Sequence, residues 1–317
     1  MMATLYLDRK HSELRYRDRR LQVRRDGALV EAFPLAMVER VVVAQHVDTD
    51  TRTLAKLAAA GISVTILPGR SARNPVAVVG LPGNDARRRL AQYAAWCDPG
   101  RRRELVRELL LLKFSMQIRF VNRLQKLRDD RRRVLTRAQG HLLALRRQLR
   151  DDAPHGDLDA LRGLEGAASA AAFRALQAVL PPQLGFTGRR RRPPPDPVNA
   201  VLSLAYMLAC SRAQEAVLAA GFDPAIGFLH APAHDRPSLA LDFVEPLRPQ
   251  VDRFVWELFR KRLLTGDHFR QIDGGCRLGK RGRAIFFQQW EHQVAGHRRW
   301  LRYLARALVM RLMKEET

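Results

Sequence analysis

Leu81-Pro82-Gly83-Asn84 divides the sequence into two parts that differ in pattern. A proline next to a glycine and an asparagine ends regular structure, because proline removes a backbone donor and the other two residues favour turns. Short β-prone runs precede this break, and long runs with helical spacing follow it. We therefore expect an α+β chain, with a small N-terminal β domain in residues 1–84 and a larger all-α domain in residues 85–317.

The part before the break reads as strands and turns. Runs typical of strands occupy residues 4–7, 13–16, 21–24, 39–44, 62–67 and 76–80. Asp26-Gly27 is a hairpin-type turn signal. Apolar residues at helical spacing in residues 51–60, ended by Gly61, predict one helix among these strands.

The part after the break reads as helices. Helical patterns occupy residues 87–96, 102–149 (one or two helices), 161–180, 198–220 and 247–264. Between two of them lies RRRRPPPDP at residues 189–197. Its prolines lack backbone donors and fix φ, which predicts an extended loop with four arginines at its start.

Charge is concentrated after the break. The chain has 56 Lys and Arg against 32 Asp and Glu, a formal net charge of +24. Residues 1–85 carry 13 basic and 9 acidic side chains, and residues 86–317 carry 43 and 23. Such an excess favours nucleic acid as the partner, since arginine and lysine neutralise phosphates. An anionic membrane surface is a weaker alternative, and a coding bias towards arginine would also raise the count.

The cysteines and the apolar runs bear on location. Cys97, Cys210 and Cys276 lie far apart without a CxxC pair, which argues against a disulfide framework or a structural zinc site and suits a reducing cytosol. The N-terminus lacks the apolar core of a signal peptide. Apolar runs of about ten residues are too short to span a bilayer. We therefore expect a cytoplasmic protein that does not enter a membrane.

Glu165 stands out in LEGAASAAAF at residues 164–173. A carboxylate on an otherwise small and apolar helix face is costly unless it has a partner or a metal ion. The alternative is an ordinary exposed glutamate in an alanine-rich helix, and composition alone favours that alternative.

A second group of polar residues follows in GFLHAP at residues 227–232 and LALDFVEPLRP at residues 239–249. Asp242 and Glu245 are three positions apart, so on a helical turn they project from one face. With His230 they make a plausible ligand set for Mg²⁺ or Mn²⁺. The alternative, favoured by spacing alone, is a capping aspartate, a surface glutamate and a satisfied core histidine.

Taken together, these segments resemble the larger, universal integrase family of CRISPR spacer acquisition. That family has a Glu-Gly start followed by small residues and an aromatic, matched by residues 165–173. It has Arg-Arg-Pro-Pro-x-Asp-Pro-Val-Asn before an apolar helix, matched by residues 191–199. It also has Gly-Phe-Leu-His, Ser-Leu-x-x-Asp and Glu-Pro-x-Arg-Pro, matched by residues 227–230, 238–242 and 245–249. Because the N-terminal segment resembles the family's β domain, the match covers essentially the whole chain.

The resemblance implies that Glu165, His230 and Glu245 are the catalytic residues and bind Mg²⁺ or Mn²⁺, with Asp242 beside them. Whether His230 ligates the metal or assists a proton on the leaving oxygen stays open. Departures from the family pattern are Phe173, the longer arginine run and the extra proline at residues 193–195. These departures concern the length of the loop and its DNA contacts. The arginines that we expect at the DNA are Arg189, Arg190, Arg191, Arg192 and Arg248.

The activity implied is that of a metal-dependent DNA endonuclease and integrase. A DNA 3′-hydroxyl attacking a repeat phosphodiester would insert a spacer into a CRISPR array, and water as nucleophile would hydrolyse DNA. The implied partners are double-stranded and branched DNA, a second copy through the β domain, and the small universal adaptation subunit in a heterohexameric complex. Two alternatives stay open: a solo integrase of a related transposon, which the lack of an extra C-terminal domain after Thr317 disfavours, and a non-catalytic basic DNA-binding scaffold.

Overall fold

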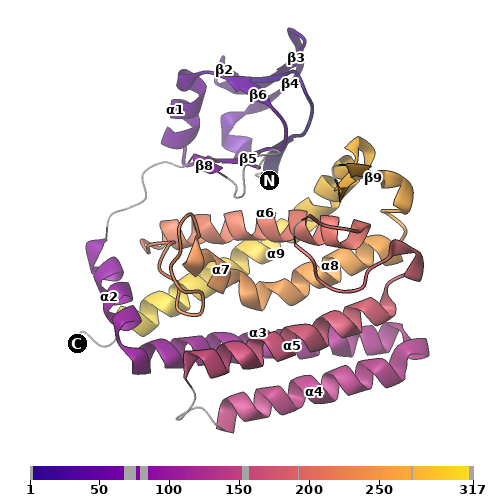
Figure 1. Cartoon of the computed structure of the whole chain (residues 1–317). Coiled ribbons are helices and arrows are strands. Elements are labelled where there is room, and N and C mark those ends of the chain that lie inside the picture. The colour runs from indigo at the N-terminus through magenta and orange to yellow at the C-terminus, as the bar shows by residue number, and fades with distance from the viewer. Residues whose placement is uncertain are drawn as a thin grey trace. The chain divides into compact units, whose positions relative to one another are not determined.

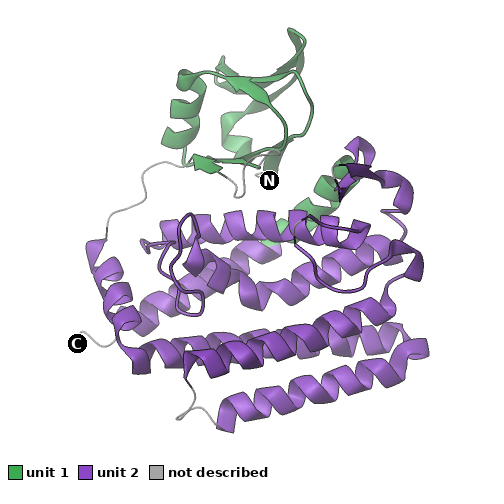
Figure 2. Cartoon of the chain, in the orientation of Figure 1, with its two compact units in different colours: residues 1–84, 283–295 green, residues 85–282, 296–317 purple. Residues whose placement is uncertain are grey.

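The computed structural model describes residues 3–67, 76–78, 85–151, 157–191, 193–272 and 274–313. The chain divides into two compact units (Figure 2), residues 1–84 with 283–295 and residues 85–282 with 296–317. The first unit is rich in strands and the second is mostly helical, which confirms the expected α+β fold class. The predicted break at residues 81–84 and Arg192 lie outside the described residues.

The strands of the first unit form two sheets. One has the order β1 (Ala3–Leu7), β5 (Val38–Val43), β7 (Ser63–Ile66) and β8 (Val76–Val78). The other has the order β4 (Ala28–Pro34), β3 (Arg20–Arg25), β2 (Ser12–Arg17) and β6 (Val47–Thr49). β5 pairs in parallel with β1 and β7 and corresponds to the strand predicted at residues 39–44. Of these strands, β4 and the short β6 were not predicted.

Helix α1 (Thr51–Ala59) begins and ends where its sequence predicts. The Asp50 side chain accepts a hydrogen bond from the backbone N–H of Thr53 at 2.6 Å, as a helix N-cap does. Gly61 follows with φ 68°, a left-handed conformation that glycine adopts without strain. The core of the unit consists of leucine, valine and isoleucine side chains from both sheets and this helix.

Residues 283–295 belong to the first unit, although they lie far away in sequence. They form part of the long helix α9 (Lys280–Met313). Glu291 accepts hydrogen bonds from the backbone N–H of Thr4 at 3.0 Å and from the Tyr6 hydroxyl at 2.9 Å. The Tyr6 ring also stacks on Phe287, with centroids 4.6 Å apart. The β unit therefore includes a helical segment that the sequence division at residue 84 does not predict.

The second unit is built from helices that Figure 1 labels, with one small hairpin. The helices are α2 (Ala86–Cys97), α3 (Pro99–Leu127), α4 (Arg132–Asp151), α5 (Leu158–Val179), α6 (Pro197–Ala219), α7 (Ser238–Val244), α8 (Arg248–Arg260) and the parts of α9 outside residues 283–295, and the hairpin is β9 (Phe269–Ile272) with β10 (Gly275–Leu278). The run at residues 102–149 is thus two helices, and Figure 1 shows α3, α4 and α5 lying side by side. The described helices include none that is long and apolar enough to cross a bilayer.

Small residues and caps set how these helices meet. Helix α5 buries alanines at helical spacing, namely Ala168, Ala171, Ala172 and Ala175. Small side chains let neighbouring backbones approach closely, which suits the packing of α5 against α3. Helix α6 begins with Asp196 as N-cap, which accepts from the backbone N–H of Asn199 at 2.8 Å, and Pro197 follows at the first helical position.

Candidate active site

His230 lies in the loop between α6 and α7, and Asp242 of α7 holds that loop. Asp242 Oδ2 accepts hydrogen bonds from the backbone N–H groups of Phe228 at 2.6 Å and Leu229 at 3.0 Å. Asp242 Oδ1 accepts from the backbone N–H of His230 at 3.0 Å and lies 2.7 Å from His230 Nδ1. An ionised carboxylate only accepts, so Nδ1 carries the hydrogen and the Nε2 lone pair is left to bind a metal or take a proton.

The same loop is fixed from its other side. Arg102 Nε donates to the Phe228 carbonyl at 2.9 Å, and the Arg162 guanidinium donates to the Leu229 carbonyl at 3.2 and 3.3 Å. Gly227 is required by space, because a Cβ there would lie 2.6 Å from the backbone carbon of Ser238. The loop therefore cannot place His230 without a glycine at this position.

Glu165 of α5 and Glu245 share one cation, the ammonium of Lys113. Glu245 begins the 3-10 turn η4 (Glu245–Leu247), and Lys113 belongs to α3. Lys113 Nζ donates to Glu245 Oε2 at 2.6 Å and also to Glu165 Oε1. His230 Nε2 lies 3.8 Å from Glu245 Oε1. The structure thus brings Glu165 and Glu245 to one lysine, and His230 to Glu245.

The exposure of these side chains differs. The side chain of Glu245 is 4% exposed, whereas those of Glu165 and His230 are each 27% exposed. Glu245 is therefore the buried residue of the three, and the side chains of Glu165 and His230 are partly exposed to solvent. Burial alone would raise the pKa of Glu245, but the charges of Arg248 and Lys113 and the nearby His230 hold it well below its usual range.

Arg248 belongs to a buried cluster behind Glu245. Its Nε donates to Glu245 Oε1 at 2.8 Å, and its guanidinium lies 4.6 Å from the centroid of the Tyr206 ring. The Tyr206 hydroxyl donates to Asp252. Burial raises the pKa of Asp252 to about 6, and burial together with the charge of Asp252 raises the pKa of Tyr206. Arg248, expected at the DNA, is thus engaged with Glu245 and Tyr206 inside the fold.

Arg189 is turned inwards as well. It donates to the side chains of Asn199 at 2.9 Å and Ser203 at 3.0 Å, and its guanidinium lies 5.5 Å from the Tyr206 ring centroid. Burial lowers its pKa to about 10. Arg190 and Arg191 are exposed. The two exposed arginines are the described members of the run whose side chains are open to a phosphate.

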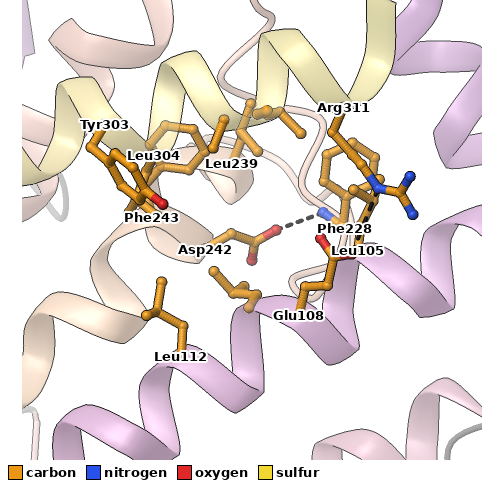
Figure 3. Close-up of a pocket in the computed structure, with 13 residues that line it drawn as sticks. Leu105, Glu108, Leu112, Phe228, Leu239, Asp242, Phe243, Tyr303, Leu304 and Arg311 are labelled. Carbon is orange, nitrogen blue, oxygen red and sulfur yellow. Dashed lines mark hydrogen bonds and ion pairs between the residues drawn. The ribbon is translucent and has the colours of Figure 1, made fainter. Parts of the chain in front are cut away.

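A mostly apolar pocket with a volume of about 200 Å³ lies on one side of Asp242 and is also lined by Phe228. Figure 3 shows it between α3, α7 and the end of α9, with Leu112, Phe243 and Leu304 among its lining residues. The dashed line from Asp242 to Phe228 in Figure 3 marks one of the bonds that hold the His230 loop. Apolar surroundings on this side leave the Asp242 carboxylate to the loop amides and to His230.

Among the residues that the structure describes, no group of three His, Cys, Asp or Glu side chains is arranged as a ready metal-binding cluster. A cation nevertheless lies between the two glutamates, because the Lys113 ammonium bonds to both. Two carboxylates and an imidazole are donors that Mg²⁺ and Mn²⁺ accept. The residues therefore fit a divalent ion by their chemistry, provided that Lys113 gives way.

Lys113, Ser169 and Tyr206 are site residues that the sequence reasoning missed. Ser169 donates to Glu165 Oε1 at 2.8 Å and accepts from Lys113 Nζ at 3.0 Å. The available signal for Lys113 was its position: it lies at helical spacing with the apolar Leu110, on the face of α3 that is buried. A single lysine on such a face needs a partner of opposite charge.

Comparison with known proteins defines the class of the chain. The model of a family described as "CRISPR associated protein Cas1" matches residues 5–292. A CRISPR-associated endonuclease Cas1 of Thermodesulfovibrio yellowstonii is 32% identical over 99% of this chain and 98% of its own length. One from Thermus thermophilus is 35% identical over 92% of this chain and 86% of its own length.

Solved structures share the fold. A casposase bound to integration product has a TM-score of 0.85 at 18% identity, covering 100% of this chain and 92% of its own. A CAS1 protein from Thermotoga maritima has a TM-score of 0.82 at 22% identity, and the match covers 98% of this chain and 97% of that protein's chain. A chain of a Cas6-RT-Cas1–Cas2 complex has a TM-score of 0.80 at 20% identity, covering 99% of this chain and 35% of its own.

The family match and these relatives define a CRISPR-associated protein. More particularly, the chain belongs to the Cas1 family.

Proposed function

We propose that the chain is a metal-dependent DNA integrase and endonuclease that inserts new spacer DNA into a CRISPR array. The observation that carries this proposal is the convergence of Glu165 and Glu245 on one cation, with His230 Nε2 3.8 Å from Glu245. Residues from three separate segments of the second unit thus meet at one place. Such a meeting of ionisable groups, partly buried and partly open, is typical of a catalytic site.

Glu165, Glu245 and His230 are the residues that would hold Mg²⁺ or Mn²⁺. When bound there, the ion supplies positive charge to the phosphate under attack and orients the nucleophile. Asp242 contributes by fixing the ring of His230 through Nδ1, so that Nε2 faces the site. His230 serves as a ligand or moves a proton at Nε2, and the open side of the site admits the substrate.

The reaction is phosphoryl transfer. The oxygen of a DNA 3′-hydroxyl forms a bond to phosphorus of a repeat phosphodiester, the bond from phosphorus to the leaving oxygen breaks, and one strand is joined. With water as the nucleophile the same exchange hydrolyses the strand, and on branched DNA the joining runs in reverse. The proton of the nucleophile ends on the leaving oxygen, and His230 Nε2 would carry it.

The partners proposed are double-stranded and branched DNA, a second copy of this chain through the β unit, and the small adaptation subunit. The excess of basic residues in 86–317 supports DNA. The similar Cas6-RT-Cas1–Cas2 structure supports an assembly with the small subunit. A reducing cytoplasm suits the three free cysteines.

A strand-transfer assay tests the proposal. The protein and the small adaptation subunit are mixed with labelled duplex that has a free 3′-hydroxyl and with repeat DNA, in Mn²⁺, in Mg²⁺ or in excess EDTA, and a parallel reaction omits the small subunit. We expect joining with either metal, none with EDTA and none in Glu165→Ala. Glu104→Ala removes a half-exposed carboxylate on α3 and is the matched control. Full joining in EDTA would overturn metal dependence. Binding without any joining would leave a DNA-binding scaffold, and joining independent of the small subunit would favour the solo integrase.

A further inference from the structure

Lys113 is a buried cation in the middle of the site. Its side chain is 1% exposed, and burying an ammonium is costly unless each N–H finds an acceptor. The three N–H groups meet three acceptors, Glu165 Oε1, Glu245 Oε2 and Ser169 Oγ. The fold therefore places a fully satisfied positive charge where two candidate metal ligands meet.

The other oxygen of Glu245 also has a donor. Arg248 Nε donates to Glu245 Oε1 at 2.8 Å, while Lys113 uses Oε2. Two carboxylates, Glu165 and Glu245, thus face two fixed cations, Lys113 and Arg248, and the four charges balance. A divalent ion that entered this set would meet oxygens already engaged by the ammonium and would repel it.

We propose that Lys113 is a place-holding cation that keeps Glu165 and Glu245 together until a divalent metal ion enters and displaces its ammonium from them. This inference rests on the proposed metal function and adds a residue that controls occupation of the site. Lys113 acts through the two glutamates and is a positioning residue. Its charge weakens metal binding, and in return the site stays folded and neutral when no metal is bound.

Removing the ammonium has two opposite consequences. Without metal, Glu245 loses a partner in a buried position, which destabilises the fold strongly. With metal, the ion no longer has to displace a cation, so the affinity rises and the lost stability returns. A lysine that only fills space would produce neither the gain in affinity nor the rescue by metal.

The test measures Mn²⁺ binding by titration calorimetry and the melting temperature in EDTA and in Mn²⁺. For Lys113→Met we expect Mn²⁺ to bind at least about tenfold more tightly than to the wild type. We expect melting about 5 °C or more lower in EDTA, with most of that loss recovered in Mn²⁺. Lys113→Arg keeps the charge and should bind Mn²⁺ no more tightly than the wild type. Lys261→Met is the matched control, because Lys261 is half-exposed and pairs with Glu257 on the surface.

Each result decides the question. Equal Mn²⁺ affinity in Lys113→Met and the wild type, or equal melting in EDTA, would overturn the place-holding role. If Lys113→Met folds only when Mn²⁺ is present, the proposal is supported, and if Mn²⁺ does not rescue its folding, the proposal fails. A wild type that binds no Mn²⁺ and joins strands in EDTA would instead refute the proposed metal function.

Discussion

Asp242→Asn tests whether one carboxylate holds the His230 loop. The two oxygens of Asp242 accept from three backbone N–H groups and face His230 Nδ1. Asparagine has nearly the same shape, but an NH₂ group replaces one of the two oxygens. The hydrogens of that group then face N–H groups of the loop, which also donate. With the NH₂ group on the Oδ2 side, the contacts with two backbone N–H groups are lost, and on the Oδ1 side the contact with the His230 N–H is lost and Nδ1 must change from donor to acceptor. The Asp242 side chain is only 2% exposed, so water cannot replace these contacts.

The size of the effect follows from those contacts. A hydrogen bond to a charged group contributes about 1.5–3 kcal/mol, so two of them amount to roughly 3–6 kcal/mol. At about 2–4 °C per kcal/mol, the melting temperature should fall by about 10 °C. Joining should also fall by about 10–100-fold, because His230 loses the partner that orients its ring.

Thermal unfolding and single-turnover joining measure the two effects together. The matched control is Asp129→Asn, since the Asp129 side chain is 85% exposed and should change stability by under about 0.5 kcal/mol. If Asp242→Asn melted within about 2 °C of the wild type, the loop would not depend on Asp242, and the reasoning would be wrong.

Two further predictions concern charge elsewhere in the second unit. Burial, with the charges of Arg212 and Arg253, lowers the pKa of His297 to about 4. Between pH 6.5 and 4 the unfolded chain therefore binds more protons than the folded chain. As the pH falls through that window, the free energy of unfolding of the wild type should drop by up to about 3 kcal/mol relative to that of His297→Leu, measured by urea unfolding. If the free energies of unfolding of the two proteins changed in parallel with pH, the prediction would be wrong. Replacing Arg190 and Arg191 together by Ala should flatten the slope of log DNA affinity against log salt by up to about 1.8, and an unchanged slope would show that neither contacts a phosphate.

The sequence predicts the fold well where patterns are local. The valine-rich β5, helix α1 and helices α2 to α6 follow from periodicity, turns and caps. It does not predict that residues 283–295 belong to the first unit, because that depends on Glu291 meeting Thr4 and Tyr6 across the length of the chain. The hairpin β9–β10 was missed because its strands are short and carry few apolar residues.

The candidate site is predictable in part. The spacing of Asp242 and Glu245 predicts that their side chains project from one face. In the structure Asp242 lies next to His230 Nδ1, and Glu245 lies on the side of His230 Nε2. The sequence cannot show that Lys113 bridges the glutamates, since α3 and η4 come together only through tertiary packing. Nor does it show that Arg189 bonds inside the fold to Asn199 and Ser203, because a run of arginines next to prolines reads as wholly exposed.

Anomalous diffraction from crystals grown with Mn²⁺ tests the central claim most directly. The account predicts a peak within about 2.0–2.6 Å of oxygens of Glu165 and Glu245 and of a His230 nitrogen, with the Lys113 ammonium displaced from the glutamates. A map with no peak there, from protein that joins DNA strands under the same conditions, would contradict it.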